Sequence, residues 1–361
     1  MKVCIVSVSA PRNTVMVSMY TEFFKENHIK YDMIYRDKFH TEEYTGAETD
    51  YRFEASRKNI LTRAFGQVAF TRFAKKVMKK NDYDFVVVWG ETAAALLSGI
   101  LKKKFSGRYC VNVRDLLEGR KRFLRKKLDV AVKSSSFTTV SSPKYIDTLP
   151  SGFKEYYFVH SYNEKIAGET DEILKNKGCK ADGAINILYI GNIRFYDHLY
   201  RFMDSIKNDP RFHLSVCGHG SEPVKEYAEA HSIKNVSTVG MFPKEQTGEY
   251  LAQADIIYNL YGTESPNLRT ALSNKLYYAC CLHIPILVYR NTSMYEFSSR
   301  CGIGFAVDDH DRERLADALY NWYNKLDNSS VNEKCSAFLE EAKASQKAVY
   351  RKLRTVLSLD R

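Results

Sequence analysis

The sequence predicts an α/β protein built from two doubly wound parallel sheets. Short apolar runs recur along the chain, and each is followed by a stretch with helical periodicity. The alternation restarts after a polar segment, and 361 residues exceed one ordinary α/β core. We therefore predict a first Rossmann-like domain over residues 1–165, a linker over 166–182 and a second Rossmann-like domain over 183–335. We expect a final helix over 336–361 to pack back on the first domain.

The first domain is predicted from apolar runs of strand length, separated by amphipathic stretches. Residues 38–50 are polar and are predicted to be irregular. The predicted strands cover residues 3–8, 31–35, 85–89, 109–113, 137–140 and 156–159, and the predicted helices cover 15–27, 57–80, 92–101 and 120–127.

The second domain repeats this pattern. Its strands are predicted at 185–190, 212–217, 236–239, 256–260, 284–289 and 303–307. Helices are predicted at 197–206, up to about 231, at 244–253, from Ser273-Asn274, and at 312–326 and 336–357. Between the strand ending at 260 and the helix at Ser273, turn-forming Gly262, Pro266 and Asn267 predict a polar loop.

Composition narrows the class of protein. The apolar content of 44% is typical of a globular chain, and no run approaches the roughly 20 apolar residues of a membrane span. The first apolar run is too short for a signal peptide. Eight cysteines are scattered without a CxxC pair, so we expect buried thiols in a reducing cytoplasm, and no metal-ligand cluster is evident.

The net charge of +11 is concentrated in one region. Residues 52–127 contain 20 Lys and Arg but 6 Asp and Glu, so the remaining chain is slightly acidic. A basic region of this kind predicts a surface that meets an anionic partner.

The stretch from Ala254 to Arg290 predicts strand, loop, helix and strand, which is a parallel βαβ unit. Its helix would begin at the carboxyl edge of the sheet with Lys275 in the first turn. Free backbone N–H groups and an ammonium there predict an anion site, most simply for phosphate. An ordinary helix start with a solvated lysine remains an equal alternative.

Four ordered segments in the second half carry a resemblance to a known family. They are Leu188-Tyr189-Ile190-Gly191, Val216-Cys217-Gly218-His219-Gly220, Val239-Gly240 followed by Ala254-Asp255, and Asn274-Lys275-Leu276-Tyr277 followed by Pro285-Ile286-Leu287. The first half adds Asn112-Val113-Arg114-Asp115, Ser141-Ser142-Pro143 and His160-Ser161-Tyr162-Asn163. Over nearly its whole length the chain resembles GT-B glycosyltransferases, close to family 4 and to bacterial capsule and exopolysaccharide enzymes.

The resemblance implies two Rossmann-like domains facing each other across a cleft, and it implies roles for particular residues. Lys275 and Arg194 would stabilise the leaving diphosphate, and Asp115 would activate the acceptor hydroxyl. The implied donor-binding residues are Gly191, Asn192, Gly218, Gly220, Ser273, Asn274, Leu276, Tyr278 and Glu264, and the implied acceptor-side residues are Ser9, Arg114 and Glu118. Ordinary strand-end turns, a helix cap and a solvated arginine are the alternatives for the glycines, Asp115 and Arg194.

Three positions depart from the family pattern. Tyr278 and Thr270 stand where acidic residues are usual, and His283 replaces a glycine. Glu264 lies in the same loop and is a candidate substitute. These changes keep two alternatives open, a catalytically silent binding protein on the same fold and a basic nucleic-acid-binding protein.

The resemblance also implies partners and location. We expect a nucleotide-sugar donor, most simply a UDP-sugar, a lipid-linked glycan acceptor, retention of configuration, and neither a metal nor another cofactor. The basic segments 57–80 and 120–127 predict docking on an anionic membrane from the cytoplasmic side. The alternative is that the apolar stripe of 57–80 faces the domain core.

Overall fold

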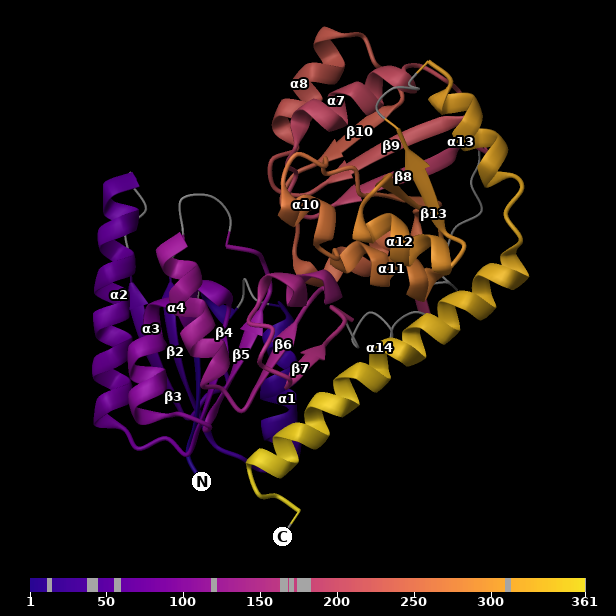
Figure 1. The fold of residues 1–361 in the computed structure, drawn as a ribbon. Coiled ribbons are helices and arrows are strands. Elements are labelled where there is room, and N and C mark those ends of the chain that lie inside the picture. The colour runs from indigo at the N-terminus through magenta and orange to yellow at the C-terminus, as the bar shows by residue number, and fades with distance from the viewer. Residues whose placement is uncertain are drawn as a thin grey trace. The chain divides into compact units, whose positions relative to one another are not determined.

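The structure is a computed structural model. It describes residues 1–11, 15–37, 45–54, 60–117, 122–162, 168, 172–173, 183–308 and 313–360. Its contacts divide the chain into two compact units (Figure 1). Unit 1 comprises Met1–His160 with Ala342–Arg361, and unit 2 comprises Ser161–Glu341. Most of the predicted linker 166–182 lies outside the described residues.

Unit 1 is built on a seven-stranded sheet in the order β3-β2-β1-β4-β5-β6-β7, with parallel pairing throughout. Its strands are β1 Val3–Ser7, β2 Tyr31–Asp37, β3 Thr49–Glu54, β4 Phe85–Trp89, β5 Tyr109–Val113, β6 Phe137–Val140 and β7 Tyr156–Phe158. All residues of β1, β2, β4, β5 and β6 are buried, which suits the mainly apolar sequences of β1 and β4; β2 also buries the charged residues Asp32, Arg36 and Asp37. Ser7 pairs with both Tyr35 and Trp89, so the carboxyl ends of these strands share one edge.

Strand β3 was not predicted, and only its first two residues, Thr49 and Asp50, overlap the segment 38–50 that was predicted to be irregular. Residues 38–44 lie outside the described residues, but Thr49–Glu54 pairs with β2 over six positions. It is an edge strand with half-buried aromatics alternating with polar residues, so it lacks the apolar run used to recognise the central strands. Arg52 forms an ion pair with the buried Asp37 of β2 at 2.8 Å.

Helices cover both faces of the unit 1 sheet. They are η2 Val15–Val17, α1 Ser18–Glu26, α2 Ile60–Lys80, α3 Glu91–Lys104, α4 Arg122–Lys133 and η3 Pro143–Thr148. α2, α3 and α4 lie on one face, and α1 lies on the other with the C-terminal part of α14 Asn328–Val356 (Figure 1). Tyr20 and Phe23 of α1 share a core cluster with Val349 and Leu353 of α14.

Helix α14 begins at Asn328, earlier than the predicted start at residue 336. Its first turn is polar and shows no helical periodicity. The Asp327 carboxylate instead accepts the backbone N–H groups of Ser329 and Ser330, at 3.1 and 3.2 Å. The helix belongs to unit 2 up to Glu341 and to unit 1 from Ala342.

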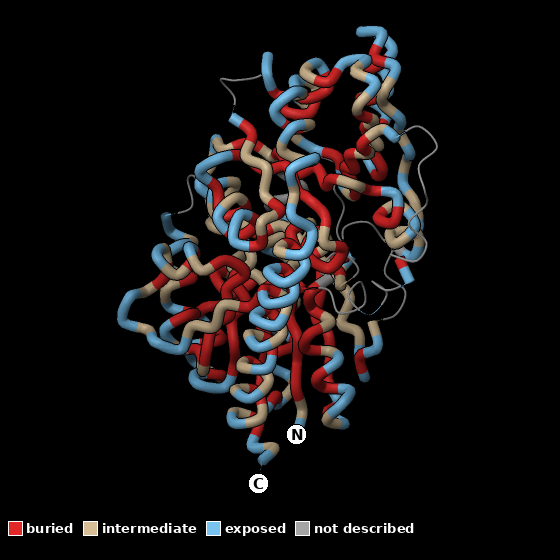
Figure 2. Tube along the Cα trace, turned by 90° about the vertical axis from the view of Figure 1, so that its right-hand side faces the viewer, coloured by how far each residue is buried: buried red, intermediate tan, exposed pale blue. Residues whose placement is uncertain are grey.

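Unit 2 is built on a six-stranded sheet in the order β10-β9-β8-β11-β12-β13, again with parallel pairing. Its strands are β8 Ile185–Ile190, β9 Phe212–Cys217, β10 Val236–Val239, β11 Ile256–Tyr258, β12 Ile286–Tyr289 and β13 Gly304–Val307. This is the doubly wound order, in which ligands bind beyond the carboxyl ends of the central strands. Figure 2 shows most of the chain's central strands as buried runs.

Two layers of helices enclose the unit 2 sheet. They are α7 Tyr196–Ser205, α8 Glu222–Ala230, η4 Lys244–Gln246, α9 Thr247–Ala252, α10 Pro266–Thr270, α11 Asn274–Leu282, α12 Ser293–Arg300 and α13 Leu315–Tyr323. Residues of α7, α8 and α13 form one core cluster with the strands. Helices α11 and α12 contact strands β11, β12 and β13.

Two short helices of unit 2 were not predicted. The predicted polar loop contains α10, because Ser265 Oγ accepts the N–H of Leu268 at 3.2 Å and Pro266 occupies the first turn. Helix α12 starts in the same way, with Thr292 Oγ1 accepting the N–H of Tyr295 at 3.1 Å. Both are too short to show apolar periodicity in the sequence.

In the described part of the chain, no helix combines the length and apolar character required of a membrane span.

Candidate functional site

Lys275 lies in the first turn of α11, at the carboxyl edge of the unit 2 sheet. Its Nζ atom is 5.8 Å from the centre of the Tyr189 ring and 5.5 Å from the centre of the Tyr261 ring. A Cβ atom at Gly191 would lie only 3.7 Å from this nitrogen. The loop after β8, the loop after β11 and the start of α11 therefore meet at the Lys275 ammonium.

This lysine is electrostatically unusual. Its pKa is lowered to about 8, mainly by burial and also by the positive charge of Arg194, against an opposite effect of Tyr278. Within the described residues, no carboxylate forms an ion pair with Lys275 or Arg194. The Lys275 side chain is half-buried and Arg194 is exposed. A partly buried ammonium beside a second cation, with no counter-ion in the described residues, favours an anionic ligand.

The amino terminus of α11 adds to this positive field. Ser273 is its N-cap, and its Oγ accepts the Lys275 N–H at 3.3 Å. The nine-residue helix presents the positive end of its dipole at the same edge. The predicted anion site thus has a helix start, Lys275 and Arg194 in one place.

Glycines allow the neighbouring loops to approach closely. Gly191 and Gly218 have φ of 108° and 142°, and a Cβ atom on Gly218 would overlap the Gly191 carbonyl. A Cβ on Gly220 would lie 2.8 Å from the Tyr196 hydroxyl, which donates to the Gly220 carbonyl at 2.9 Å. The requirement for glycine at Gly218 and Gly220 is therefore at least partly structural.

The other predicted donor-binding residues differ in accessibility. Asn192 is exposed, Asn274 and Tyr278 are half-buried, and Leu276 is fully buried in the core of unit 2. Thr270, which stands where the family usually has an acid, is half-buried and donates its hydroxyl to the Pro266 carbonyl at 2.7 Å.

Glu264 forms part of a network that sequence reasoning missed. Its Oε1 lies 2.8 Å from His198 Nε2, and His198 Nδ1 lies 2.7 Å from the Tyr289 hydroxyl. The Glu264 side chain remains 62% exposed, whereas His198 is buried. Neither His198 nor Tyr289 carried a signal in the sequence, because both fit an ordinary core position.

A cavity of about 220 Å³ adjoins the start of α11. It is lined by Asn259, Tyr261, Gly262, Leu268, Ala271, Leu272, Ser273, Tyr289, Thr292 and Met294. Asn259 is 4% exposed, and its Oδ1 has no hydrogen-bond partner. A ligand group in this cavity could therefore meet an unsatisfied amide as well as apolar and aromatic walls.

The acceptor-side predictions fall at the carboxyl edge of unit 1. Asp115 follows β5 and is exposed, and the Arg114 guanidinium lies 5.5 Å from the centre of the Trp89 ring. The half-buried Ser9 donates its N–H to Ser7 Oγ at 3.1 Å. Glu118 lies outside the described residues.

Glu91 joins Asp115 at this edge and was missed as a site residue. Burial raises the pKa of the Glu91 carboxyl, and the negative charge of Asp115 raises that pKa further. In the sequence, Glu91 immediately precedes the helix predicted at 92–101, which is a common place for an acid. Its proximity to Asp115 arises because β4 and β5 are neighbours in the sheet.

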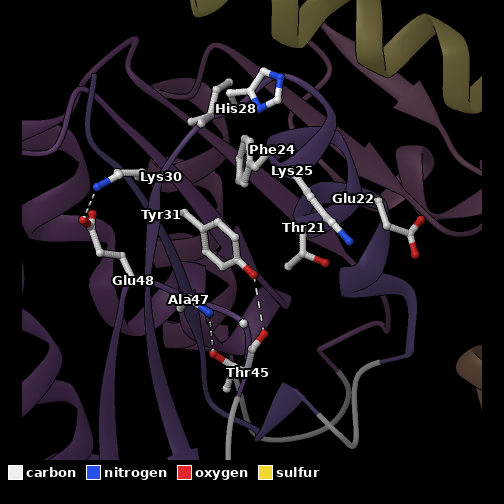
Figure 3. Close-up of a pocket in the computed structure, with 12 residues that line it drawn as sticks. Thr21, Glu22, Phe24, Lys25, His28, Lys30, Tyr31, Thr45, Ala47 and Glu48 are labelled. Carbon is white, nitrogen blue, oxygen red and sulfur yellow. Dashed lines mark hydrogen bonds and ion pairs between the residues drawn. The ribbon is translucent and has the colours of Figure 1, made fainter.

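A larger cavity in unit 1 lies away from these residues. It has a volume of about 620 Å³ and opens between the end of α1 and the starts of β2 and β3 (Figure 3). Lys25, His28 and Tyr31 line it, and Lys30 pairs with Glu48 at its rim at 2.9 Å. This is the amino edge of the sheet, opposite to Asp115, so none of the predicted site residues lies there.

The basic region predicted from the sequence includes an outward face on α2 and α4. Phe65 is 72% exposed and Phe123 is 67% exposed, so these aromatics do not face the domain core. Among the described side chains of the apolar stripe predicted for 57–80, Phe70, Ala74 and Val77 are buried, whereas Phe65 and Val68 are exposed. We call the exposed set the basic-aromatic face; it comprises Phe65, Val68, Arg72 and Lys76 of α2 and Arg122, Phe123, Arg125 and Lys126 of α4.

The two helices also concentrate positive charge next to this face. Burial lowers the pKa of Lys75 in α2, and the neighbouring charges of Lys127 and Lys79 lower it further. The Lys127 ammonium lies 4.4 Å from the centre of the Phe123 ring. Residues 57–59 and 120–121 of the predicted basic segments lie outside the described residues.

The known proteins that are similar to this chain are similar in structure. No protein-family model matches the sequence, and none of the curated proteins matches it. Sucrose-phosphate synthase from Thermosynechococcus elongatus has a TM-score of 0.72 at 13% identity, with 98% of this chain and 99% of that chain covered. Anabaena Alr3699/HepE, in complex with UDP and glucose, has a TM-score of 0.68 at 12% identity, covering 98% and 100%.

UDP-GlcNAc 2-epimerase from Neisseria meningitidis, bound to UDP-GlcNAc, has the same overall fold. Its TM-score is 0.58 at 15% identity, and 94% of this chain and 99% of that chain are covered. The fold is therefore GT-B, with two Rossmann-like α/β units, as the sequence predicted. At such low identities the similarity establishes the fold, and the activity has to be inferred from the residues of the candidate site.

Proposed function

We propose that the chain is a glycosyltransferase that uses a nucleoside diphosphate sugar. One observation carries the proposal: Lys275 and Arg194, two cations without a carboxylate partner in the described residues, lie together at the amino terminus of α11. A glycosyl donor departs as a diphosphate, so negative charge builds on the leaving oxygen in the transition state. Two cations and a helix start oriented toward that charge would stabilise it.

The neighbouring elements suit the rest of a nucleotide sugar. The glycine loops after β8 and β9 let a ligand approach the backbone, and the cavity beside Ser273 would take part of the sugar. UDP is our first choice of nucleotide, because HepE and the epimerase of the same fold are bound to UDP or UDP-GlcNAc.

The chemistry needs no metal ion at the diphosphate. Lys275, Arg194 and the α11 dipole supply the positive charge that a divalent ion supplies in other transferases. We propose that transfer proceeds without a metal and with retention at the anomeric carbon. Addition of EDTA should therefore leave the rate unchanged.

On the acceptor side, we propose that Asp115 orients or deprotonates the attacking hydroxyl. Burial and the negative charge of Asp115 raise the pKa of the neighbouring Glu91 carboxyl, so Glu91 is a second candidate for handling the acceptor proton. We propose that the acceptor is a lipid-linked glycan of bacterial surface polysaccharide synthesis. The basic-aromatic face supports this, because a chain docked on an anionic membrane would meet such an acceptor there.

Two alternatives are motivated by particular residues. Tyr278 and Thr270 replace family acids, which favours a silent binding protein on the same fold. The positive charge of the α2 and α4 region favours nucleic-acid binding. A third alternative is an epimerase that acts on nucleotide sugars, because UDP-GlcNAc 2-epimerase has the same fold.

The test compares Lys275→Met with Lys225→Met. Methionine keeps the apolar stem between Tyr189 and Tyr261, and Lys225 is an exposed lysine of the same unit. We expect Lys275→Met to lower transfer from the accepted UDP-sugar at least tenfold, on the order of the effect of removing one transition-state charge. Lys225→Met should behave as the parent protein.

The donor is first found by thermal shift with UDP-, GDP- and other sugar nucleotides, because ligand binding raises the melting temperature. Binding without transfer to any acceptor would support the silent protein, and interconversion of free UDP-sugars would support the epimerase. Equal transfer by parent and Lys275→Met would contradict the role of this lysine. Salt-sensitive binding of RNA or DNA without sugar-nucleotide binding would support the nucleic-acid alternative.

A further inference from the structure

Three cysteines that are far apart in the sequence converge in unit 2. Cys280 lies in α11, Cys301 ends α12 and Cys335 lies in α14. They are separated by 21 and 34 positions along the chain, so no metal-ligand cluster is recognisable from their spacing. The fold brings their sulfur atoms within 4.8 Å of one another.

The sulfur geometry suits a single metal ion. Cys280 Sγ lies 3.8 Å from Cys301 Sγ, and Cys335 Sγ lies 3.9 Å from the Cys301 carbonyl oxygen. Metal–thiolate bonds of about 2.3 Å place two sulfurs on one ion roughly 3.8–4.0 Å apart. The Cys280–Cys301 pair already has this spacing, and Cys335 would need a displacement of about 1 Å or less to match it.

The three-cysteine cluster is also buried away from solvent, and its thiols differ from the other buried thiols in being grouped. All three side chains are 0% exposed, and Tyr277, Phe297 and Phe338 form aromatic contacts in this part of the unit. Cys4, Cys110 and Cys217 are also buried, but none of them belongs to a group of potential metal ligands among the described residues. Isolated buried cysteines act as small apolar residues, whereas three thiols with sulfurs facing one another form a set of soft ligands.

We propose that Cys280, Cys301 and Cys335 form a binding site for a soft, thiophilic monovalent metal ion, with Cu(I) as the best fit. Soft thiolates select Cu(I), which accepts three sulfur ligands, whereas a structural zinc site needs four. No fourth His, Cys, Asp or Glu joins the three thiols in the described residues. The site lies on the opposite end of α11 from Lys275 and takes no part in the proposed transfer.

Binding is a ligand exchange without a redox change. The thiols that become thiolates release their protons to solvent as copper–sulfur bonds form, and copper remains in the monovalent state. The exposed Arg300 next to Cys301 supplies positive charge near the anionic cluster, and it is held by Glu341 of α14 at 2.7 Å. The ion would join α11, α12 and α14, and it would stabilise the folded state by mass action.

The experiment titrates the reduced full chain with Cu(I) under anaerobic conditions, against a chromophoric Cu(I) chelator. We expect one copper per chain, a thiolate-to-copper charge-transfer band in the ultraviolet and a higher melting temperature. Cys280→Ala and Cys335→Ala should each weaken Cu(I) binding at least a hundredfold. Cys110→Ala and Cys217→Ala are matched controls, because they remove equally buried thiols outside the cluster, and they should bind like the parent.

X-ray absorption of the copper-loaded parent provides a second measurement that does not depend on how the variants fold. It should show three sulfur neighbours at about 2.3 Å. Absence of a charge-transfer band in the parent would overturn the proposal. So would equal losses in cluster and control variants, or fewer than three sulfurs around the copper. Because transfer of sugar is not a readout, failure here would leave the proposed function untouched.

Discussion

His198 Nε2 lies 2.8 Å from Glu264 Oε1, and this contact joins the first turn of α7 to the loop that follows β11. The imidazole is itself held by the Tyr289 hydroxyl at the end of β12. Three segments that surround the proposed donor site are therefore connected through one buried histidine. The position of the Glu264 loop depends on this histidine.

The first prediction concerns that connection. In His198→Phe, the Tyr289 hydroxyl loses its contact with the imidazole and Glu264 is released, so urea unfolding should show a loss of about 1–3 kcal/mol in the free energy of unfolding. In Glu264→Ala, the exposed half of the pair is removed, and the loss in the free energy of unfolding should be about 1 kcal/mol or less.

Glu264→Ala should still raise the donor Kd several-fold, because the loop after β11 loses its contact with His198. Glu226→Ala, an exposed acid of the same unit, is the control, and a donor Kd as low as that of the control would contradict this role.

The second prediction concerns pH. The pKa of Lys275 is lowered to about 8 in the free protein, below its usual 10.5, so the ammonium loses its proton as pH rises through about 8. The proposed role requires the charged form, so kcat/KM should fall by about tenfold per pH unit above that point. A bound diphosphate favours the charged form, so the limb in kcat should lie at higher pH.

Lys275→Arg provides the comparison for this pH limb. A guanidinium stays charged throughout this range, so the variant should lack the fall in kcat/KM above about pH 8, whatever its absolute rate. A parallel fall in parent and variant would assign the titration to another group.

The third prediction concerns the basic-aromatic face. The parent should float with vesicles that contain anionic lipid and should dissociate as salt rises. Each basic residue near the surface contributes about 1 kcal/mol, so replacing Arg122, Arg125, Lys126 and Lys127 with glutamine should weaken binding on the order of a thousandfold. Phe65→Ser with Phe123→Ser should also weaken it, because both rings are exposed.

The control for this experiment changes the same number of charges elsewhere. Arg201, Lys207, Lys225 and Lys234 are exposed residues of unit 2, and their replacement with glutamine alters the net charge equally. This variant should float like the parent. Equal losses in both variants would show that total charge matters and the face does not, and a parent that fails to float at low salt would remove the membrane proposal.

The sequence predicted the fold well where local pattern decides the structure. Strands such as Tyr109–Val113 and Phe212–Cys217 agree residue for residue, because they are short runs of mainly apolar residues that are mostly buried in a parallel sheet. The edge strand Thr49–Glu54 and the short helix Pro266–Thr270 lack an apolar pattern and escaped prediction. Their stability comes from pairing with β2 and from the Ser265 cap.

Part of the candidate site could be predicted from the sequence for the same reason. Lys275 follows a recognisable βαβ pattern, so its placement at a helix start could be expected. The partners of Glu264 and the thiol cluster could not be anticipated, because they depend on which distant segments meet. His198 lies 66 positions before Glu264 in the numbering, and the three thiols lie on three different helices. A single sequence contains no local signal for contacts between segments that are distant along the chain.

One face of the unit 1 sheet is covered by α1 together with Val349, Leu353 and Leu357 of residues 342–361. The ribosome makes those residues only after all of unit 2 has been synthesised. Unit 1 therefore cannot complete its core while it is emerging, and Phe23 lacks its Tyr350 neighbour during that time. For this protein the order of synthesis and the order of folding must differ: the first unit to leave the ribosome finishes folding only after the second unit has been made.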